Sequence, residues 1–278
     1  MLSNRALLGF VTAVALGSCG KPADDARNDV SAEENVGVEA TPLPVKVATL
    51  DRAQLLLATA RAASAAALGQ DDSEAQRKLR GALFDTRIRF GCPSDNMQVS
   101  GGPFSLRFEE QTRTLRIRAQ PDLDQSDPMI AQIGGETVEA VEGFRMYRPW
   151  LLDAACPPAP PKADVEAGPA EPGAERTAPR LHWVGIAQFF TESDSRTRRR
   201  DHRAYEATKI LPEGMEPSRS GYDLVLSGRL RPLPGGKVIT CIGNIADQPP
   251  NCIVSVEFDR VRIERADNRE PLAEWAAS

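Results

Sequence analysis

The chain has 278 residues, with 34 lysines and arginines against 39 aspartates and glutamates, so its formal net charge is −5. The acidic surplus lies in residues 20–45 (two basic, six acidic) and 157–179 (two basic, four acidic), while residues 46–156 (14 basic, 15 acidic) and 180–278 (15 basic, 14 acidic) are nearly neutral. A nucleic-acid-binding protein needs a strongly basic face, so this distribution excludes that class of partner.

The first predicted element is an apolar leader. Arg5 supplies one positive charge, and an apolar run of about eleven residues follows it, from Ala6 to Leu16. A helix that crosses a bilayer needs about 20 such residues. The run is therefore too short to span, and it predicts a cleaved signal peptide over residues 1–18.

The leader ends with Leu16, Gly17, Ser18 and Cys19, an aliphatic residue, two small residues and a cysteine. This ending closely resembles the lipobox of bacterial lipoproteins, and the resemblance covers only about the first twenty residues. It implies that Cys19 receives a diacylglyceryl group, that the preceding peptide is removed, and that the new amino group is acylated by a fatty acid such as palmitate. Several acyl chains anchor a protein durably in a membrane. The alternative is an ordinary signal peptide with an incidental cysteine.

The residue after the cysteine bears on the compartment. In enterobacterial lipoproteins, an aspartate directly after the cysteine favours retention in the inner membrane. This chain has Gly20 there instead, so the resemblance implies the periplasmic side of the outer membrane. The inner membrane is the alternative. The polar, acidic residues that follow lack periodicity. Residues 19–45 are therefore expected to form a lipidated, disordered tether.

Residues 46–156 are expected to form an α+β lobe. Asp51 with Gln54 three residues later resembles a capping box, so a helix is expected to start there and to end near Gly69. The helix would bury a face that includes Leu57. A second helix is expected over residues 73–83.

The apolar period then changes from helical to two. Residues 83–90, 104–110 and 114–119 alternate apolar with polar side chains, and the second and third runs are joined by a hairpin-sized connection. Such runs predict an antiparallel sheet with one apolar face, on which the preceding helices pack. The aromatic residues Phe144, Tyr147 and Trp150 close the lobe.

Residues 157–179 are rich in proline, alanine and glutamate, and they are either a linker between domains or a long surface loop within one domain. Residues 180–278 contain five strand-like runs and are expected to form a β-rich lobe, a small barrel or a sandwich. In the last run, the apolar residues move one step out of phase after Phe258. That shift predicts a β-bulge near Asp259 and Arg260.

Four cysteines remain besides Cys19, and an even number in an exported protein predicts two disulfides. We favour Cys241–Cys252, which would join two strands across a turn, and Cys92–Cys156, which would tie an early strand end to the end of the first lobe. Reduced, buried cysteines are the alternative. No metal-binding pattern of cysteines occurs, and neither a metal nor a cofactor is expected.

Five arginines alternate with apolar residues in the first lobe. They are Arg87, Arg89, Arg107, Arg116 and Arg118. If their strands are neighbours, five guanidinium groups share one face, which would suit lipid headgroups, lipopolysaccharide or the carboxylates of peptidoglycan. The alternative is an ordinary solvated face that is neutralised by neighbouring acids such as Asp85. A basic loop at residues 193–203 is a second candidate surface for anionic lipid or a partner.

Candidate catalytic residues are sparse. The two histidines are His182, on an expected strand, and His202, in the basic loop, and neither belongs to a known catalytic motif. We therefore expect a lipid-anchored envelope protein with a non-catalytic binding or scaffolding role in the periplasm. The alternatives are a subunit of an envelope secretion or assembly complex and a periplasmic enzyme whose site is assembled from scattered residues.

Overall fold

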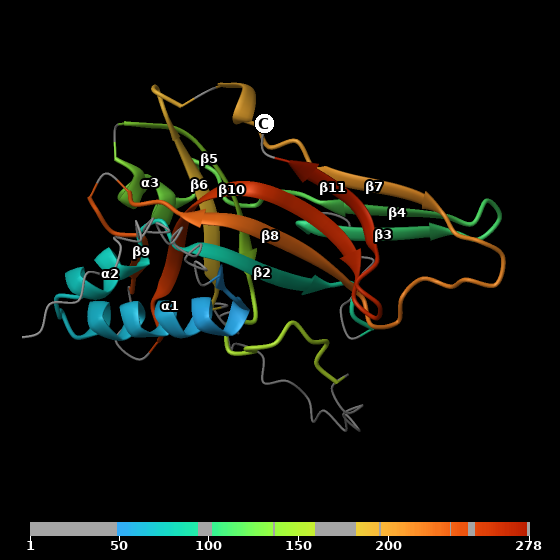
Figure 1. Ribbon diagram of the computed structural model, residues 1–278, viewed down its shortest axis with the longest axis horizontal. Coiled ribbons are helices and arrows are strands. Elements are labelled where there is room, and N and C mark those ends of the chain that lie inside the picture. Colours follow the sequence, from blue (N-terminus) through green and yellow to red (C-terminus); the bar gives the residue numbers. More distant parts are fainter. Residues whose placement is uncertain are drawn as a thin grey trace, which may run out of the picture. The chain divides into compact units, whose positions relative to one another are not determined.

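The computed structural model describes residues 49–93, 102–135, 137–158, 182–194, 196–233, 235–243 and 248–276 (Figure 1). The expected signal peptide, Cys19 and the tether lie outside these residues, as does most of the segment 157–179. None of the described helices combines the length and the apolar character that crossing a bilayer requires.

The helices begin where capping residues predict them. Asp51 caps α1 (Arg52–Ala67), with the expected capping box to Gln54. The buried face of α1 differs from the expected one, because Leu55 and Leu56 are buried whereas Leu57 is 48% exposed.

Two more short α-helices lie in the described part of the chain. The helix expected over residues 73–83 ends early, as α2 (Ser73–Leu79), because the chain turns into strand at Leu83. The helix α3 (Pro128–Gly134) was not predicted. Asp127 caps it and Pro128 occupies its first turn, which is a recognisable start signal.

The large sheet has eight strands in the order β1-β2-β8-β10-β6-β5, with β9 and β11 also paired to β10. Their bounds are β1 (Thr49–Leu50), β2 (Leu83–Phe90), β5 (Val138–Met146), β6 (Val184–Thr191), β8 (Tyr222–Leu230), β9 (Ile239–Ile242), β10 (Asn251–Arg265) and β11 (Pro271–Ala276). The sheet is mixed rather than antiparallel, because β1 runs parallel to β2 and β6 runs parallel to β10.

The long strand β10 is the centre of this sheet. Its first half pairs with β6 and β9, and its second half pairs with β8 and β11. The predicted bulge is confirmed by the shift in register between Phe258 and Arg260. Gly228 lies opposite this bulge, and a Cβ there would come within 2.0 Å of the Glu257 carbonyl oxygen, so only glycine fits without a backbone shift.

The small sheet has three antiparallel strands, β3 (Phe104–Glu109), β4 (Thr114–Ala119) and β7 (Tyr205–Ile210). The expected hairpin joins β3 to β4, with Phe104 opposite Ala119. The third strand, β7, comes from the second half of the sequence and pairs with β4. A short 3-10 helix, η1 (Arg196–Arg198), precedes it.

The structure differs from the expected division into two lobes. Strands from both halves pair in both sheets, as in β2 with β8, β5 with β6, and β4 with β7, and residues 46–278 form one contact unit. Within the described residues, the strands after residue 180 therefore build no separate closed barrel. The fold is a mixed α+β fold. The apolar faces of the two halves bury each other in one shared main core.

The main core contains buried residues of α1, of the large sheet including β10, and of the small sheet, so it lies between the two sheets and under α1. A second, smaller core lies under α3, around Leu123, Ile130 and Phe189. The strand β6 has a core on each side, which explains why nearly all of its residues are buried.

Candidate functional site

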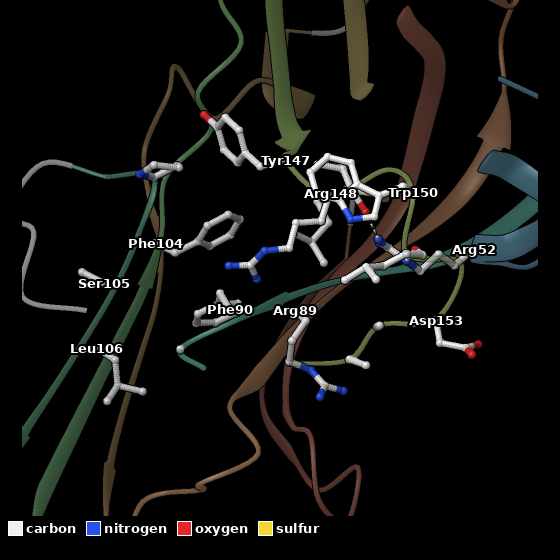
Figure 2. A pocket seen from close by; sticks show the side chains of 17 residues that line it. Arg52, Arg89, Phe90, Phe104, Ser105, Leu106, Tyr147, Arg148, Trp150 and Asp153 are labelled. Carbon is white, nitrogen blue, oxygen red and sulfur yellow. Dashed lines mark hydrogen bonds between the residues drawn. The ribbon is translucent and has the colours of Figure 1, made fainter. Parts of the chain in front are cut away.

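A pocket of about 380 Å³ lies in the seam between the two sheets (Figure 2). The end of β2 and the start of β3 form two of its walls, and the last residue of β5 with the segment that follows it, residues 146–155, forms the third. We call this cavity the seam pocket. Its volume lies within the range of roughly 300–1,000 Å³ that is typical of sites for small organic ligands.

Aromatic rings form the floor of the seam pocket. Phe90 ends β2 and Phe104 starts β3, and their rings stack with centroids 4.9 Å apart. Phe104 continues the row to Phe144, 6.3 Å away in the core. At the rim, Trp150 leaves 63% of its surface exposed. An apolar ligand could thus pack between a rigid aromatic floor and an exposed indole.

The third wall is fastened by a buried arginine. Arg52, the first residue of α1, is only 9% exposed. Its guanidinium donates hydrogen bonds to the carbonyl oxygens of Leu151, Arg87 and Arg148, at 3.0, 2.6 and 3.2 Å. Burial lowers the pKa of Arg52 to about 10, which still leaves it charged at neutral pH. Three backbone contacts therefore hold the wall against β2.

A disulfide fixes the same wall at its far end. Cys92 and Cys156 are bonded, with their Cα atoms 5.4 Å apart, and the pocket-lining residues Gly91 and Ala155 directly adjoin them. The second disulfide joins Cys241 of β9 to Cys252 of β10, which are opposite each other in the strand register. These are the two pairings that the sequence favours.

The seam pocket carries more positive than negative charge. Its lining residues include three arginines and one acid, Asp153. Arg89 is neutralised by Asp223, through contacts of 2.6 and 3.0 Å. Arg148 reaches into the pocket towards Phe104 and Phe90, whereas Asp153 points away from it (Figure 2). The guanidinium group of Arg148 therefore lies among the aromatic rings of the pocket.

The polar groups near the seam pocket suit binding more than proton transfer. Tyr147 donates a hydrogen bond of 2.7 Å to Asp122, and burial raises its pKa to about 12, so its hydroxyl stays protonated. Asp122 in turn is held by Arg145 at 3.5 Å. Asp122 is therefore committed to structural contacts.

The five arginines of the expected anion-binding face do not share one face. Arg87 and Arg89 lie on β2 in the large sheet, and the other three lie on the small sheet. Arg87 pairs with Asp85 and Glu264, at 3.0 and 3.1 Å. The hypothesis required the three strands to be neighbours, and this condition is not met, because β2 pairs with β1 and β8.

The remaining three arginines lie on the exposed side of the small sheet. Arg118 pairs with Glu206 at 3.3 Å. Arg107 and Arg116 lie directly opposite each other in the strand register, and neither has a carboxylate partner among the residues that the structure describes. Only these two match the open arrangement that the anion-binding hypothesis requires.

The two histidines lie outside the seam pocket. His182 precedes β6, and its pKa is lowered, mainly by burial. His202 has a positive φ of 58° in the basic loop. It lies near Asp124, whose pKa is lowered first by a hydrogen bond from Ser126 and to a lesser degree by His202.

The sequence identified the segments that line the seam pocket, but it did not predict that they lie together. Phe90 and Phe104 were placed on apolar strand faces, and Trp150 in an aromatic cluster near Cys156. The favoured Cys92–Cys156 disulfide was the signal that could have brought these segments together. Arg52 was missed, because the first position of an amphipathic helix is usually exposed.

Comparison with known protein families, curated proteins and solved structures gave no match to this chain.

Proposed function

We propose that this chain is a lipid-anchored envelope protein whose role is to bind a ligand in the seam pocket without catalysing a reaction on it. The lipobox ending at Cys19 and the two disulfides support an oxidising envelope compartment. The site that carries the proposal is the seam pocket, with its aromatic floor and its inward arginine.

The ligand we propose is an amphiphile with an apolar body and one anionic head. The body would pack on Phe90, Phe104 and Trp150, since large aromatic side chains give much contact area at little cost in side-chain entropy. The head would meet the guanidinium group of Arg148, because arginine donates paired hydrogen bonds to carboxylates and phosphates. Envelope lipids and their fatty-acid fragments have this chemistry.

A titration with dodecanoate and dodecanol tests the ligand class. The chain from Gly20 onward, which lacks the lipid and needs no detergent, is titrated with each compound by calorimetry. We expect dodecanoate to bind about tenfold more tightly, which corresponds to one charge-assisted hydrogen bond. In Arg148→Gln that preference should disappear. Equal affinities in the wild type would refute an anionic head, and the absence of binding by either compound would refute the binding role itself.

The anchor has its own test. Mass spectrometry of the protein extracted from membranes should find an acylated Cys19 at the amino terminus, and Cys19→Ser should leave the chain without acyl groups. An intact, unmodified leader on the native protein would refute the proposed location.

A scaffolding role in an envelope complex is the second candidate. The strand β3 ends the small sheet, and its outer edge has no paired strand among the described residues. Such an edge can accept a strand from another chain. Crosslinking in intact cells followed by affinity capture should then recover one reproducible envelope protein.

A further inference from the structure

A second pocket, of about 170 Å³, lies beside Tyr205 at the start of β7, across the small sheet from Phe104 at the start of β3. It is enclosed by the basic loop before β7, the middle of β10 and the end of β11. It is too small for most organic ligands, whose sites begin at roughly 300 Å³. We call it the loop pocket. Its size suits a single small polar group.

Arginine dominates the lining of the loop pocket. Arg199, Arg200, Arg203 and Arg260 all line it, and Glu142 is the one acid among its lining residues. The Oε1 atom of Glu142 accepts the backbone N–H groups of Arg200 and Asp201, at 2.6 and 2.8 Å. This carboxylate therefore anchors the loop, and it leaves the guanidinium groups of Arg200 and Arg203 without an ion pair.

The four arginines are not equally neutralised. Arg199 pairs with Glu139 at 2.7 Å, and Arg260 pairs with Glu274 at 3.6 Å. Arg200 donates to the carbonyl oxygen of Ala204 at 3.3 Å, and Arg203 donates to that of Arg200 at 3.0 Å. Within the described residues, neither Arg200 nor Arg203 pairs with a carboxylate.

Two buried donors in this lining have no acceptor in the described part of the chain. The Nε atoms of Arg199 and Arg200 are buried, and neither makes a hydrogen bond within the described residues. Buried polar groups in proteins nearly always have a partner, so each exception calls for a water or an ion. Arg199 already pairs with Glu139. A water molecule could accept from the Nε–H group of Arg200, but it could not neutralise that guanidinium charge. An anion would do both.

The loop pocket is also organised before any ligand arrives. The guanidinium of Arg200 lies over the ring of Tyr205, with the Cζ atom 4.3 Å from the ring centroid. Gln188 accepts the Phe258 N–H group with its Oε1 atom, which leaves its NH₂ group to donate. Burial raises the pKa of Tyr205, so its hydroxyl also remains a donor. The lining is thus rich in fixed donors.

We propose that the loop pocket binds a tetrahedral oxyanion, the phosphate group of inorganic phosphate or of a phosphomonoester, held by Arg200 and Arg203. The proposal is independent of the amphiphile in the seam pocket, since the two pockets share no lining residue. It assigns a role to the basic loop that the ligand-binding function leaves unused.

Calorimetry on the full lipidated protein in nonionic detergent tests this proposal, with inorganic phosphate and with glycerol 3-phosphate as separate titrants. We expect saturable one-to-one binding at constant ionic strength. Tighter binding of glycerol 3-phosphate would identify a lipid-like head as the source, and tighter binding of inorganic phosphate would identify the free ion. The absence of binding by both, beyond that of chloride, would overturn the proposal.

Variants of one loop give the matched control. Arg203→Gln should weaken phosphate binding about tenfold, because it removes a charged donor. Arg203→Lys should recover part of this loss, because the charge returns without the planar fork. Arg196→Gln removes an exposed charge of the same loop that does not line the pocket, and it should leave the affinity unchanged. Equal losses in Arg196→Gln and Arg203→Gln would show non-specific attraction and overturn the site.

Arg200→Gln is the second test of the lining. It should abolish the saturable phosphate binding. Thermal unfolding without phosphate will show whether the substitution damages the loop itself, and phosphate binding at wild-type affinity in a folded Arg200→Gln would overturn the site. Arg203 is exposed, so Arg203→Gln should unfold at the same temperature as the wild type. This variant therefore still tests the site if Arg200→Gln does not fold.

Discussion

Arginines on the polar face of the large sheet and arginines around the seam pocket have different surroundings. On the large sheet, Glu264 meets both Arg87 and Arg262 at 3.1 and 2.9 Å, and Arg89, which also lines the seam pocket, meets Asp223. In the seam pocket, Arg52 donates to three backbone carbonyls, and Arg148 reaches towards aromatic rings. Carboxylates thus surround the guanidinium groups on the large sheet, whereas carbonyl groups and aromatic rings surround those of Arg52 and Arg148 in the pocket.

Removing either disulfide should lower the stability of the protein at least as much as any other change considered below. Replacing Cys92 and Cys156 by serine should cost about 4 kcal/mol of stability, because the bond closes a loop of 64 residues. It should also weaken dodecanoate binding, since the bond ties two walls of the pocket. The matched variant without Cys241–Cys252, whose separation is 11 residues, should lose about 3 kcal/mol and keep its affinity.

Urea unfolding and calorimetry measure both quantities. Equal losses of affinity in the two disulfide variants would mean that the Cys92–Cys156 bond has no special relation to the seam pocket.

Breaking a neutralised pair on the large sheet should have the next largest effect. The side chains of Asp223 and Arg89 are 3% and 14% exposed. Asp223→Asn should therefore cost about 3 kcal/mol in urea unfolding, because it leaves a nearly buried guanidinium unpaired. The control is Glu206→Gln, which breaks the exposed pair with Arg118 and should change stability by less than about 0.5 kcal/mol. Similar costs for both variants would contradict the structural role of the large-sheet pairs.

A rim substitution separates binding from stability. Trp150→Ala should reduce the affinity for dodecanoate about tenfold, because the indole covers the apolar body of the ligand. Its effect on unfolding should stay below about 0.5 kcal/mol, since the side chain is 63% exposed. Leu152→Ala, on the same wall but outside the lining, should change neither quantity. A stability loss without a loss of affinity would place Trp150 in the fold instead of the site.

The smallest expected effect is spectroscopic. The chain has three tyrosines, and burial raises the pKa of Tyr147 to about 12 and also raises the pKa values of Tyr205 and Tyr222. The protonated hydroxyls contribute stability that is complete below about pH 10, the ordinary tyrosine value, and is lost as the pH rises through about 12 for Tyr147. Absorbance at alkaline pH should therefore show no tyrosine ionising near pH 10 until the chain unfolds. A normal tyrosine titration in the folded protein would contradict the buried environment of all three.

Local features of the fold were predictable from the sequence, and long-range pairing was not. The capping box at Asp51, the hairpin between β3 and β4 and the bulge after Phe258 each depend on neighbouring residues, and all three were expected. Alternation along β2 shows which residues face the core, but it does not show which strand lies beside it. For that reason the sequence did not show that β8 is the partner of β2, and the shared face of the five arginines stayed conditional on their strands being neighbours.

The site shows the same limit. The sequence contained each wall of the seam pocket, yet their meeting depends on the Cys92–Cys156 bond and on three carbonyl contacts of Arg52. Backbone carbonyls leave no mark in a sequence, so a buried arginine that binds them looks like any exposed arginine at a helix start.

Native mass spectrometry of the protein extracted from its own membrane tests the central claim most directly. The account predicts that the wild type carries one anionic amphiphile per chain beside its acyl groups, and that Arg148→Gln, with the same acyl groups, comes out empty. A wild type that carries nothing, or an Arg148→Gln variant that carries the same load, would contradict it.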